Sequence, residues 1–140
     1  MTRSDFDPFA AVLAFHRKLG VHVEERPGFP AEPIVDLRVR LLREEMSELE
    51  RAVADRDVVE VADALADLVY VAYGTAISFG IDLRPIFGEV HRSNMAKGGG
   101  GTRADGKVLK PPDWTPPRIR ALLEEMRLGE EETADHAGDE

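Results

Sequence analysis

The sequence predicts an all-α fold, a bundle of four or five helices. Apolar residues recur three and four positions apart along several stretches, no stretch shows the alternation expected of a β-strand, and no internal repeat is visible. A chain of 140 residues is long enough for one domain with a single buried core. Only two tyrosines and one tryptophan are present. The core must therefore be mainly aliphatic, which suits packed helices.

The first two predicted helices flank a proline-rich loop. The first runs from about Asp7 to Leu19, with Pro8 in its first turn and Gly20 as its stop. Residues 21–33 contain three prolines and a glycine and form the loop. The second helix runs from near Pro33 to about Ala54. Its apolar stripe consists of Ile34, Leu37, Leu41, Leu42, Leu49 and Val53.

The third predicted helix is the most apolar of the chain. It runs from Asp57, a good N-cap, to about Phe79, with Gly80 as its stop. Apolar residues cover nearly every side, as expected of a central, buried helix. Gly74, in its middle, lowers helix propensity by roughly 1 kcal/mol relative to alanine, so we expect close packing against another helix there.

The C-terminal part contains a short helix, a long loop and a last helix. The fourth helix runs from about Arg84 to Ala96, started by Asp82 or Arg84. Residues 97–115 are glycine-rich and basic, and loops of this length are usually functional or disordered. The last helix is expected from Thr115, with Pro116 and Pro117 in its first turn, to near Leu128.

Residues 1–128 form the single predicted domain, and residues 129–140 form a predicted disordered tail. The tail holds six acidic residues and no Lys or Arg, a composition typical of a solvating segment. The whole chain has a net charge of -9, which argues against tight nonspecific binding to nucleic acid. No run approaches the eighteen or so apolar residues of a membrane span, and no signal core is visible. We expect a cytoplasmic protein, and the lack of cysteine excludes thiolate sites.

Two groups of acidic residues lie on the second and third predicted helices, each at spacings that place it on one face. The groups are Glu44, Glu45 and Glu48, and then Glu60, Asp63 and Asp67. Such groups repel one another unless a cation lies between them. Carboxylate oxygens on helices suit a hard divalent cation such as Mg²⁺, together with waters and substrate phosphates. The sequence therefore predicts a metal site between these two helices.

Part of each group also fits an interpretation without a metal. The first group could be a solvated face, balanced by neighbouring Arg40, Arg43 and Arg51. Glu60 lies three residues after Asp57, as in a variant of the capping box. Asp63 and Asp67 are harder to explain in this way, because an unpaired carboxylate on so apolar a helix is costly to bury.

The acidic residues also carry a resemblance to a known superfamily. The pattern Glu-Glu-x-x-Glu, followed on the next helix by Asp-Leu-x-Tyr, stands at Glu44, Glu45, Glu48, Asp67 and Tyr70. This combination resembles the all-α nucleoside triphosphate pyrophosphohydrolases, which include MazG-like enzymes, dimeric dUTPases and phosphoribosyl-ATP pyrophosphohydrolases. The strings VHRSNMAK and ADGKVLKP are similar to a MazG-like branch with a dUTP-preferring member. The resemblance spans roughly Phe15 to Trp114 and implies a MazG-like bundle completed by dimerisation.

The resemblance implies hydrolysis of a nucleoside triphosphate to a monophosphate and pyrophosphate, as in sanitation of the nucleotide pool. The implied cofactors are two or three Mg²⁺ ions, for which Mn²⁺ would substitute. The implied metal ligands are Glu45, Glu48 and Asp67, completed by Glu60, Asp63 or both. Glu44 and Glu45 are the implied catalytic residues, with Glu44 orienting or deprotonating the attacking water, or serving as a ligand. The implied substrate-binding residues are Asn94, Lys97, Lys107 and Tyr70, and Arg103 and Lys110 could also close over the phosphates.

One position departs from the family pattern. The second motif usually reads Glu-x-x-Asp, but Ala64 stands three residues before Asp67. Either Asp63 supplies the missing ligand, or Glu60 and Asp63 form the motif one turn upstream. The identity of the ligands and the number of metals therefore stay open.

Other functions also stay open. Within the superfamily, the chain could hydrolyse phosphoribosyl-ATP in histidine biosynthesis, because substrate choice depends on how a base fits the groove. From another class, it could be a non-catalytic helical module whose acidic faces bind a basic partner. The apolar third helix and the resemblance favour a homodimer or a dimer of dimers. The resemblance favours dUTP or another pyrimidine deoxynucleotide as substrate.

Overall fold

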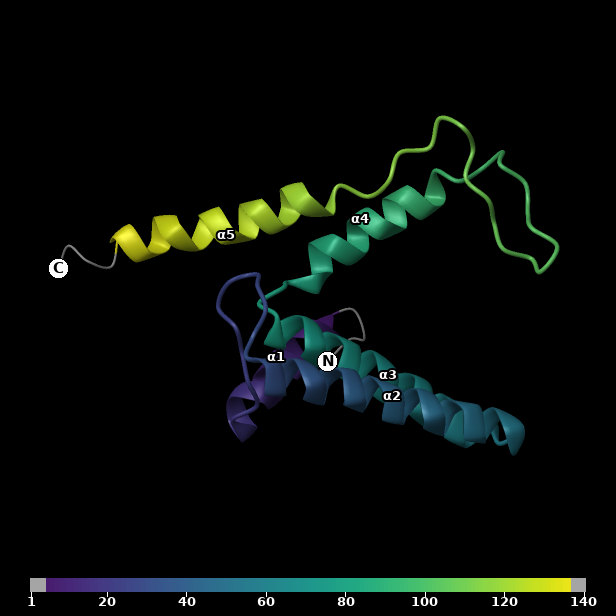
Figure 1. Ribbon diagram of the computed structural model, residues 1–140, viewed down its shortest axis with the longest axis horizontal. Coiled ribbons are helices and arrows are strands. Elements are labelled where there is room, and N and C mark those ends of the chain that lie inside the picture. The colour runs from purple at the N-terminus through teal and green to yellow at the C-terminus, as the bar shows by residue number, and fades with distance from the viewer. Residues whose placement is uncertain (1–4, 137–140) are drawn as a thin grey trace. The chain divides into compact units, whose positions relative to one another are not determined.

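The regular structure of this chain is helical, as predicted. The computed structural model describes residues 5–136, with side chains described as far as Gly129. Within this range the β-structure consists of one isolated bridge, between Thr102 and Val108. The helices are α1 (Pro8–Leu19), α2 (Glu32–Ala54), α3 (Val58–Ser78), α4 (Leu83–Met95) and α5 (Ile119–His136) (Figure 1). The all-α prediction is thus confirmed.

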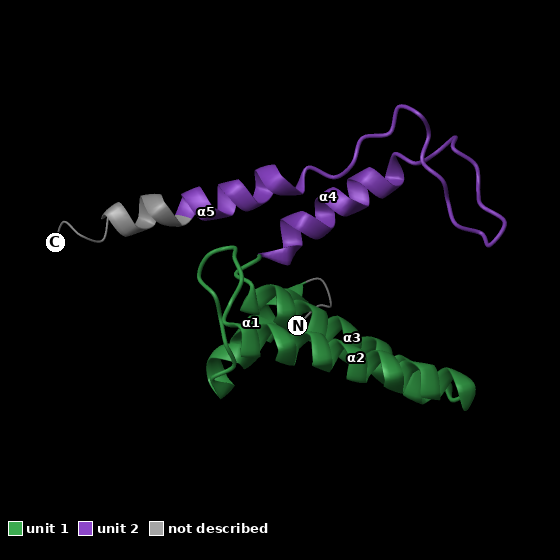
Figure 2. Ribbon diagram, viewed as in Figure 1, with its two compact units in different colours: residues 1–81 green, residues 82–140 purple. Residues whose placement is uncertain are grey.

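The chain divides into two compact units (Figure 2). Unit 1, residues 1–81, contains α1, α2 and α3, and unit 2, residues 82–140, contains α4, the glycine-rich loop and α5. The predicted division into a domain of residues 1–128 and a disordered tail of residues 129–140 stays a prediction. Residues 137–140 lie outside the described part of the chain.

Short polar side chains and glycines determine the helix ends at the predicted places. The carboxylates of Asp7, Asp57 and Asp82 each accept a backbone N–H from the first turn of α1, α3 and α4. Gly20 ends α1 in the left-handed conformation, with φ at 68°. Gly80 follows α3 with φ at 69°, and a β-carbon there would collide with the carbonyl of Arg26.

Helix α5 differs from the prediction at both ends. It begins at Ile119 and not at Thr115, and it continues to His136, past the predicted end near Leu128. Thr115 and Pro116 each precede a proline, and a following proline disfavours helical backbone. The two prolines therefore stand before the helix and not in its first turn.

Helix α3 packs against both α1 and α2 in unit 1, and α2 and α3 run side by side (Figure 1). Small residues let the helices approach, since Ala52 of α2 and Ala64 of α3 are both buried. The opposite side of α3 is not covered in the single chain. Val58 is 77% exposed and Val69 is 50% exposed, so α3 is not the central, buried helix that was predicted within a single chain.

By length and composition alone, α3 would also be able to cross a membrane. This is weak evidence, because core helices of soluble proteins meet the same criteria. Asp63 and Asp67 lie on this helix, where carboxylates in lipid would be costly. Its packing against α1 and α2 buries only part of its apolar surface, since 28% of the apolar window is buried.

Candidate metal centre

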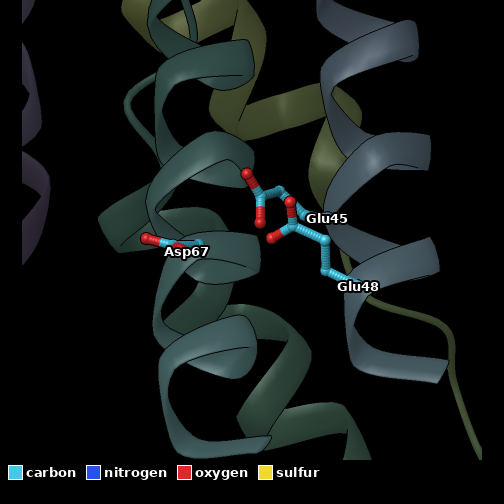
Figure 3. A group of neighbouring side chains, drawn as sticks. All are labelled: Glu45, Glu48 and Asp67. Carbon is cyan, nitrogen blue, oxygen red and sulfur yellow. The ribbon is translucent and has the colours of Figure 1, made fainter. Parts of the chain in front are cut away.

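Three carboxylates from α2 and α3 converge in unit 1. One oxygen each from Glu45, Glu48 and Asp67 lies within 4.8 Å of the other two. Glu45 and Glu48 extend from α2 toward α3, which carries Asp67 (Figure 3). Glu45 and Glu48 share a face because they are three residues apart on one helix. The packing of α2 on α3 then brings Asp67 to them.

Glu45 is the least satisfied member of this cluster. Its Oε2 atom is buried and has no hydrogen-bond partner in the described part of the chain. A buried polar atom without a partner costs about 1–3 kcal/mol, and more when it is charged. Burial raises the pKa of Glu45. The nearby charges of Glu48, Asp67 and Asp63, and a side-chain hydrogen bond with Glu48, raise this pKa further. An anionic site that lacks a positive partner is what a cation would stabilise.

The residues present therefore fit a divalent metal ion. Carboxylate oxygens are the ligands that Mg²⁺ and Mn²⁺ prefer, and three of them converge here on two rigid helices. A bound cation would give Glu45 Oε2 the partner that the described protein atoms do not supply. It would also relieve the repulsion among the three carboxylates.

The other predicted acidic residues lie outside the converging trio. Asp63 acts on Glu45 through its charge, so it lies near the cluster. Glu60 is exposed, and its backbone N–H donates to the carboxylate of Asp57 at 3.3 Å, which is half of the predicted capping box. Glu44 is also exposed. The metal role of Glu60 and Asp63 and the catalytic role of Glu44 stay predictions.

Ala64, the departure from the family pattern, is an interior position. It is 3% exposed, on the same helix as Asp67. Asp63, one residue earlier, is exposed, and its charge raises the pKa of Glu45. Of the two residues that could replace the missing glutamate, Asp63 is thus the one whose charge affects the cluster.

A second charged group lies on the same two helices, and sequence reasoning missed it. Arg38 is 5% exposed and seven residues before Glu45 on α2. Its guanidinium donates to the carbonyl of Val71 at 2.9 Å and to the hydroxyl of Thr75 at 3.2 Å, both on α3. No ion pair joins it to a carboxylate among the described residues. The sequence did offer one signal for this group, because Arg38 is spaced so that it lies within the apolar stripe of α2.

Gly74 makes room for this group. A β-carbon at Gly74 would lie 2.5 Å from Nη2 of Arg38 and 2.7 Å from Nε2 of His16. The predicted close approach is therefore real, but two polar side chains fill the space and not a helix backbone. His16 is buried, and its Nδ1 bonds the carbonyl of His22 at 3.1 Å. Burial lowers the pKa of His16, and the charge of Arg38 lowers it further.

The predicted substrate-binding residues are divided between the units. Tyr70 lies in unit 1, where its ring packs edge-on against Phe15 of α1, with the two ring centroids 5.5 Å apart. It also lines an apolar pocket of about 400 Å³ between α1 and α3, together with Leu65 and Val69. Asn94, Lys97 and Lys107 lie in unit 2. Their role in binding substrate stays a prediction.

Comparison with known proteins gives two findings. The sequence profile of the phosphoribosyl-ATP pyrophosphohydrolase family matches residues 12–94, which is more than half of the chain and includes all three clustered carboxylates. A curated relative, an uncharacterized protein of Acanthamoeba polyphaga mimivirus, is 45% identical over 79 residues. That alignment covers 54% of this chain and 32% of the viral protein. The chain thus spans about a third of this relative.

Proposed function

This chain belongs to the phosphoribosyl-ATP pyrophosphohydrolase family, within the MazG-like superfamily, and from that premise we propose that it is a nucleotide pyrophosphohydrolase. Water would attack the bond between the α and β phosphates of a nucleoside triphosphate and release a monophosphate and pyrophosphate. The convergence of Glu45, Glu48 and Asp67 around a buried oxygen without a partner carries the proposal. Arrangements of this kind hold cations in proteins.

The proposed cofactor is Mg²⁺, which Mn²⁺ would replace, with two or three ions per site. Glu45, Glu48 and Asp67 would hold it, and Asp63 or Glu60 would complete the set. When bound, the metal would lower the pKa of a water ligand and neutralise charge on the phosphates. Without cations these carboxylates would repel a triphosphate.

The chain's own residues would orient the water and the substrate. Glu44, beside the cluster on α2, is the proposed base for the attacking water, with Glu45 as the second catalytic carboxylate. Asn94, Lys97 and Lys107 would bind sugar or phosphate through an amide and two ammonium groups. Tyr70 would contact the substrate through its exposed edge, since 40% of the residue is exposed.

The proposed substrates are (d)NTPs, with dUTP as the first candidate. A second candidate is phosphoribosyl-ATP, which the name of the matched family favours. Both reactions break the same phosphoanhydride bond, so the carboxylate cluster serves either. Measuring pyrophosphate release from each common NTP and dNTP and from phosphoribosyl-ATP would separate them.

We also propose that the protein is a homodimer, or a dimer of dimers, and cytoplasmic. The apolar side of α3 supports dimerisation, because Val58 and Val59 are 77% and 71% exposed in the single chain. Exposed apolar residues gathered on one helix are typical of an interaction surface. Light scattering during size-exclusion chromatography would give the mass, and a monomer at micromolar concentration would contradict the dimer.

The products and the metal requirement test the enzymatic proposal. We expect pyrophosphate and nucleoside monophosphate in equal amounts, and no turnover after removal of divalent metal with EDTA. Release of single phosphate would contradict a pyrophosphohydrolase. Lack of turnover with every candidate, together with a melting temperature insensitive to Mg²⁺, would instead favour a non-catalytic module that binds a basic partner.

A further inference from the structure

A buried arginine joins α2 to α3 near the carboxylate cluster. Nη2 of Arg38 donates to the carbonyl of Val71 at 2.9 Å, and Nε of Arg38 donates to the hydroxyl of Thr75 at 3.2 Å. The Thr75 hydroxyl in turn donates to the same Val71 carbonyl at 2.8 Å. These three bonds close a ring between the two helices. A planar guanidinium that bonds in two places fixes its orientation as well as its distance.

This ring of hydrogen bonds and the carboxylate cluster are neighbours along one helix pair. Arg38 precedes Glu45 by seven residues, which is about 10 Å along α2. Val71 follows Asp67 by four residues, which is about one turn of α3. The two contacts follow each other in opposite directions along the helices, as in an antiparallel pair. A change at Arg38 that slides or tilts α2 would therefore alter the spacing between Glu45 and Asp67.

Arg38 supplies the directional contacts between these helices. Among the described residues, the side-chain hydrogen bonds that join α2 to α3 both come from its guanidinium. Other contacts include the small buried residues Ala52 and Ala64, and apolar packing is not directional. The cluster itself pushes the helices apart, because its three carboxylates repel one another while no cation is bound. A directional contact nearby is what would hold these carboxylates at one spacing.

The surroundings of the guanidinium hold it in one position. Arg38 is 5% exposed. Its Nη2 atom lies 2.5 Å from the point where a β-carbon of Gly74 would stand, and Nε2 of His16 lies 2.7 Å from the same point. A side chain enclosed in this way is ordered before any ligand binds, so the contact between the helices is preorganised.

The effect of Arg38 on the cluster is one of placement and not of charge. The charges that shift the pKa of Glu45 come from Glu48, Asp67 and Asp63, and all of them are negative. A role that depends on charge would be kept by lysine, whereas a contact at two points would not. The two explanations therefore predict different results for one substitution.

We propose that Arg38 is a positioning residue of the metal centre, and that its two hydrogen bonds set the spacing between the carboxylates of α2 and Asp67 of α3. This rests on the proposed function, because a divalent ion must occupy the cluster. Mg²⁺ demands nearly ideal octahedral geometry with ligands at about 2.0–2.1 Å, whereas Ca²⁺ accepts flexible geometry at about 2.3–2.6 Å. Carboxylates held at one spacing favour the more demanding ion. Arg38 thus supports selectivity for Mg²⁺ over Ca²⁺.

Metal binding to the intact protein tests this role without turnover. Electron paramagnetic resonance would measure Mn²⁺ binding, and Mg²⁺ or Ca²⁺ would then be added to displace it. Arg38→Lys keeps the charge but not the contact at two points. We expect it to weaken Mg²⁺ binding by about tenfold, as for residues that orient metal ligands, and Ca²⁺ binding by less than about threefold. Arg40→Lys, an exposed change on the same helix, should leave both affinities within about twofold of wild type.

Thr75 provides a second test in which Arg38 stays intact. Thr75→Val keeps the shape of the side chain but removes the hydroxyl that accepts from Nε of Arg38. It should weaken Mg²⁺ binding by about threefold to tenfold, the effect of one hydrogen bond. Thr75→Ser keeps the hydroxyl and should stay within about twofold of wild type. Circular dichroism at the temperature of the titration would establish that each variant is folded. If Arg38→Lys does not fold, the comparison of the two Thr75 variants decides.

Several results would overturn the proposal. Wild-type affinity for both ions in folded Arg38→Lys would show that the contact does not control the cluster. Equal weakening of Mg²⁺ and Ca²⁺ binding would show a general loosening and no control of geometry. Failure of the proposed function differs from these results, because the wild type itself would then bind no Mn²⁺ and Arg38 would have no metal centre to position. A wild type that binds Mn²⁺ but releases no pyrophosphate leaves the test of Arg38 valid.

Discussion

The interface between α2 and α3 buries charged groups in two places, and these places differ in whether the buried group has a hydrogen-bond partner. Arg38 is buried, and its guanidinium donates to Val71 and Thr75 of α3. Two turns further along α2, Glu45 has a buried oxygen with no described partner and two other carboxylates close by. One charge is satisfied within the chain and the other is not. Burial of a charge therefore does not by itself indicate a functional site, whereas an unsatisfied cluster of like charge is an arrangement that a bound cation would stabilise.

The difference has a thermodynamic consequence. The Arg38 group contributes hydrogen bonds that hold α2 against α3, so damage there should reduce stability. The carboxylates repel one another until a cation binds, so their removal should reduce activity and not stability. Activity and stability should thus separate in the carboxylate variants.

The largest expected effect is on catalysis. Glu48→Gln and Asp67→Asn should each lower the rate of pyrophosphate release by on the order of 100-fold or more, because each removes a proposed metal ligand while keeping the side-chain shape. Their melting temperatures in EDTA should equal or exceed that of the wild type, since one repelling charge is gone. Glu50→Gln, an exposed change on the same helix, is the control and should keep full activity. Wild-type turnover in either cluster variant would show that the site is wrongly placed.

The next effect is on the free energy of unfolding. Gly74→Ala should destabilise unit 1 by about 1–3 kcal/mol, because the new methyl group would overlap the space of Arg38 and His16. Gly88→Ala is a matched control on α4, where a β-carbon would meet nothing within 4 Å. Because alanine favours a helix over glycine, this substitution should raise the free energy of unfolding by up to about 1 kcal/mol. Urea denaturation would measure both. If Gly74→Ala and Gly88→Ala raised the stability equally, Arg38 and His16 would be loosely packed around Gly74.

A smaller effect is expected when metal is added. At a Mg²⁺ concentration ten times its dissociation constant, the folded state gains about 1.4 kcal/mol, which corresponds to a rise of about 4 °C in melting temperature. The rise should be much reduced in Asp67→Asn and fully kept in Gly88→Ala, because only the first loses a ligand. If Mg²⁺ left the melting temperature of the wild type unchanged, this would contradict the proposed metal centre.

The smallest effect concerns how the free energy of unfolding depends on pH through His16, which lies beside Arg38. His16 faces Arg38, and its neighbour His22 pairs with Glu24 at 2.8 Å. The pKa of His16 in the folded chain lies below 6.5, chiefly because of burial, so the unfolded chain binds more protons just below that pH. Stability should therefore fall as the pH drops below about 6.5 toward the lowered pKa. His16→Gln should weaken this dependence, and an unchanged melting profile between pH 7 and 5 in both proteins would contradict it.

Local features of the sequence predicted the helices well, because their signals are local. Aspartate caps at Asp7, Asp57 and Asp82, and the stop at Gly20, depend on the chemistry of a few neighbouring residues. The start of α5 was predicted wrongly because a proline pair suits either a first turn or the extended segment before it. Composition showed that α3 is apolar on nearly every side, but it does not show whether helices of the same chain cover all of that surface.

The candidate site was only partly visible in the sequence. Spacing placed Glu45 and Glu48 on one face, but the same spacing fits a solvated surface. The packing of α2 on α3 selected Glu45, Glu48 and Asp67 from six candidates. Arg38 was overlooked because it is one of many charged residues on this helix, and only its place within the apolar stripe distinguishes it from them.

By itself, the sequence determined the all-helical class, the helix caps and the helices that carry the acidic residues, because each follows from periodicity and local hydrogen bonding. Tertiary structure alone decided which charges are satisfied. It joined Arg38 to Val71 and Thr75 across two helices, and it left Glu45 Oε2 without a partner. Such pairings depend on distances between residues remote in the sequence, and only the packed chain sets those distances.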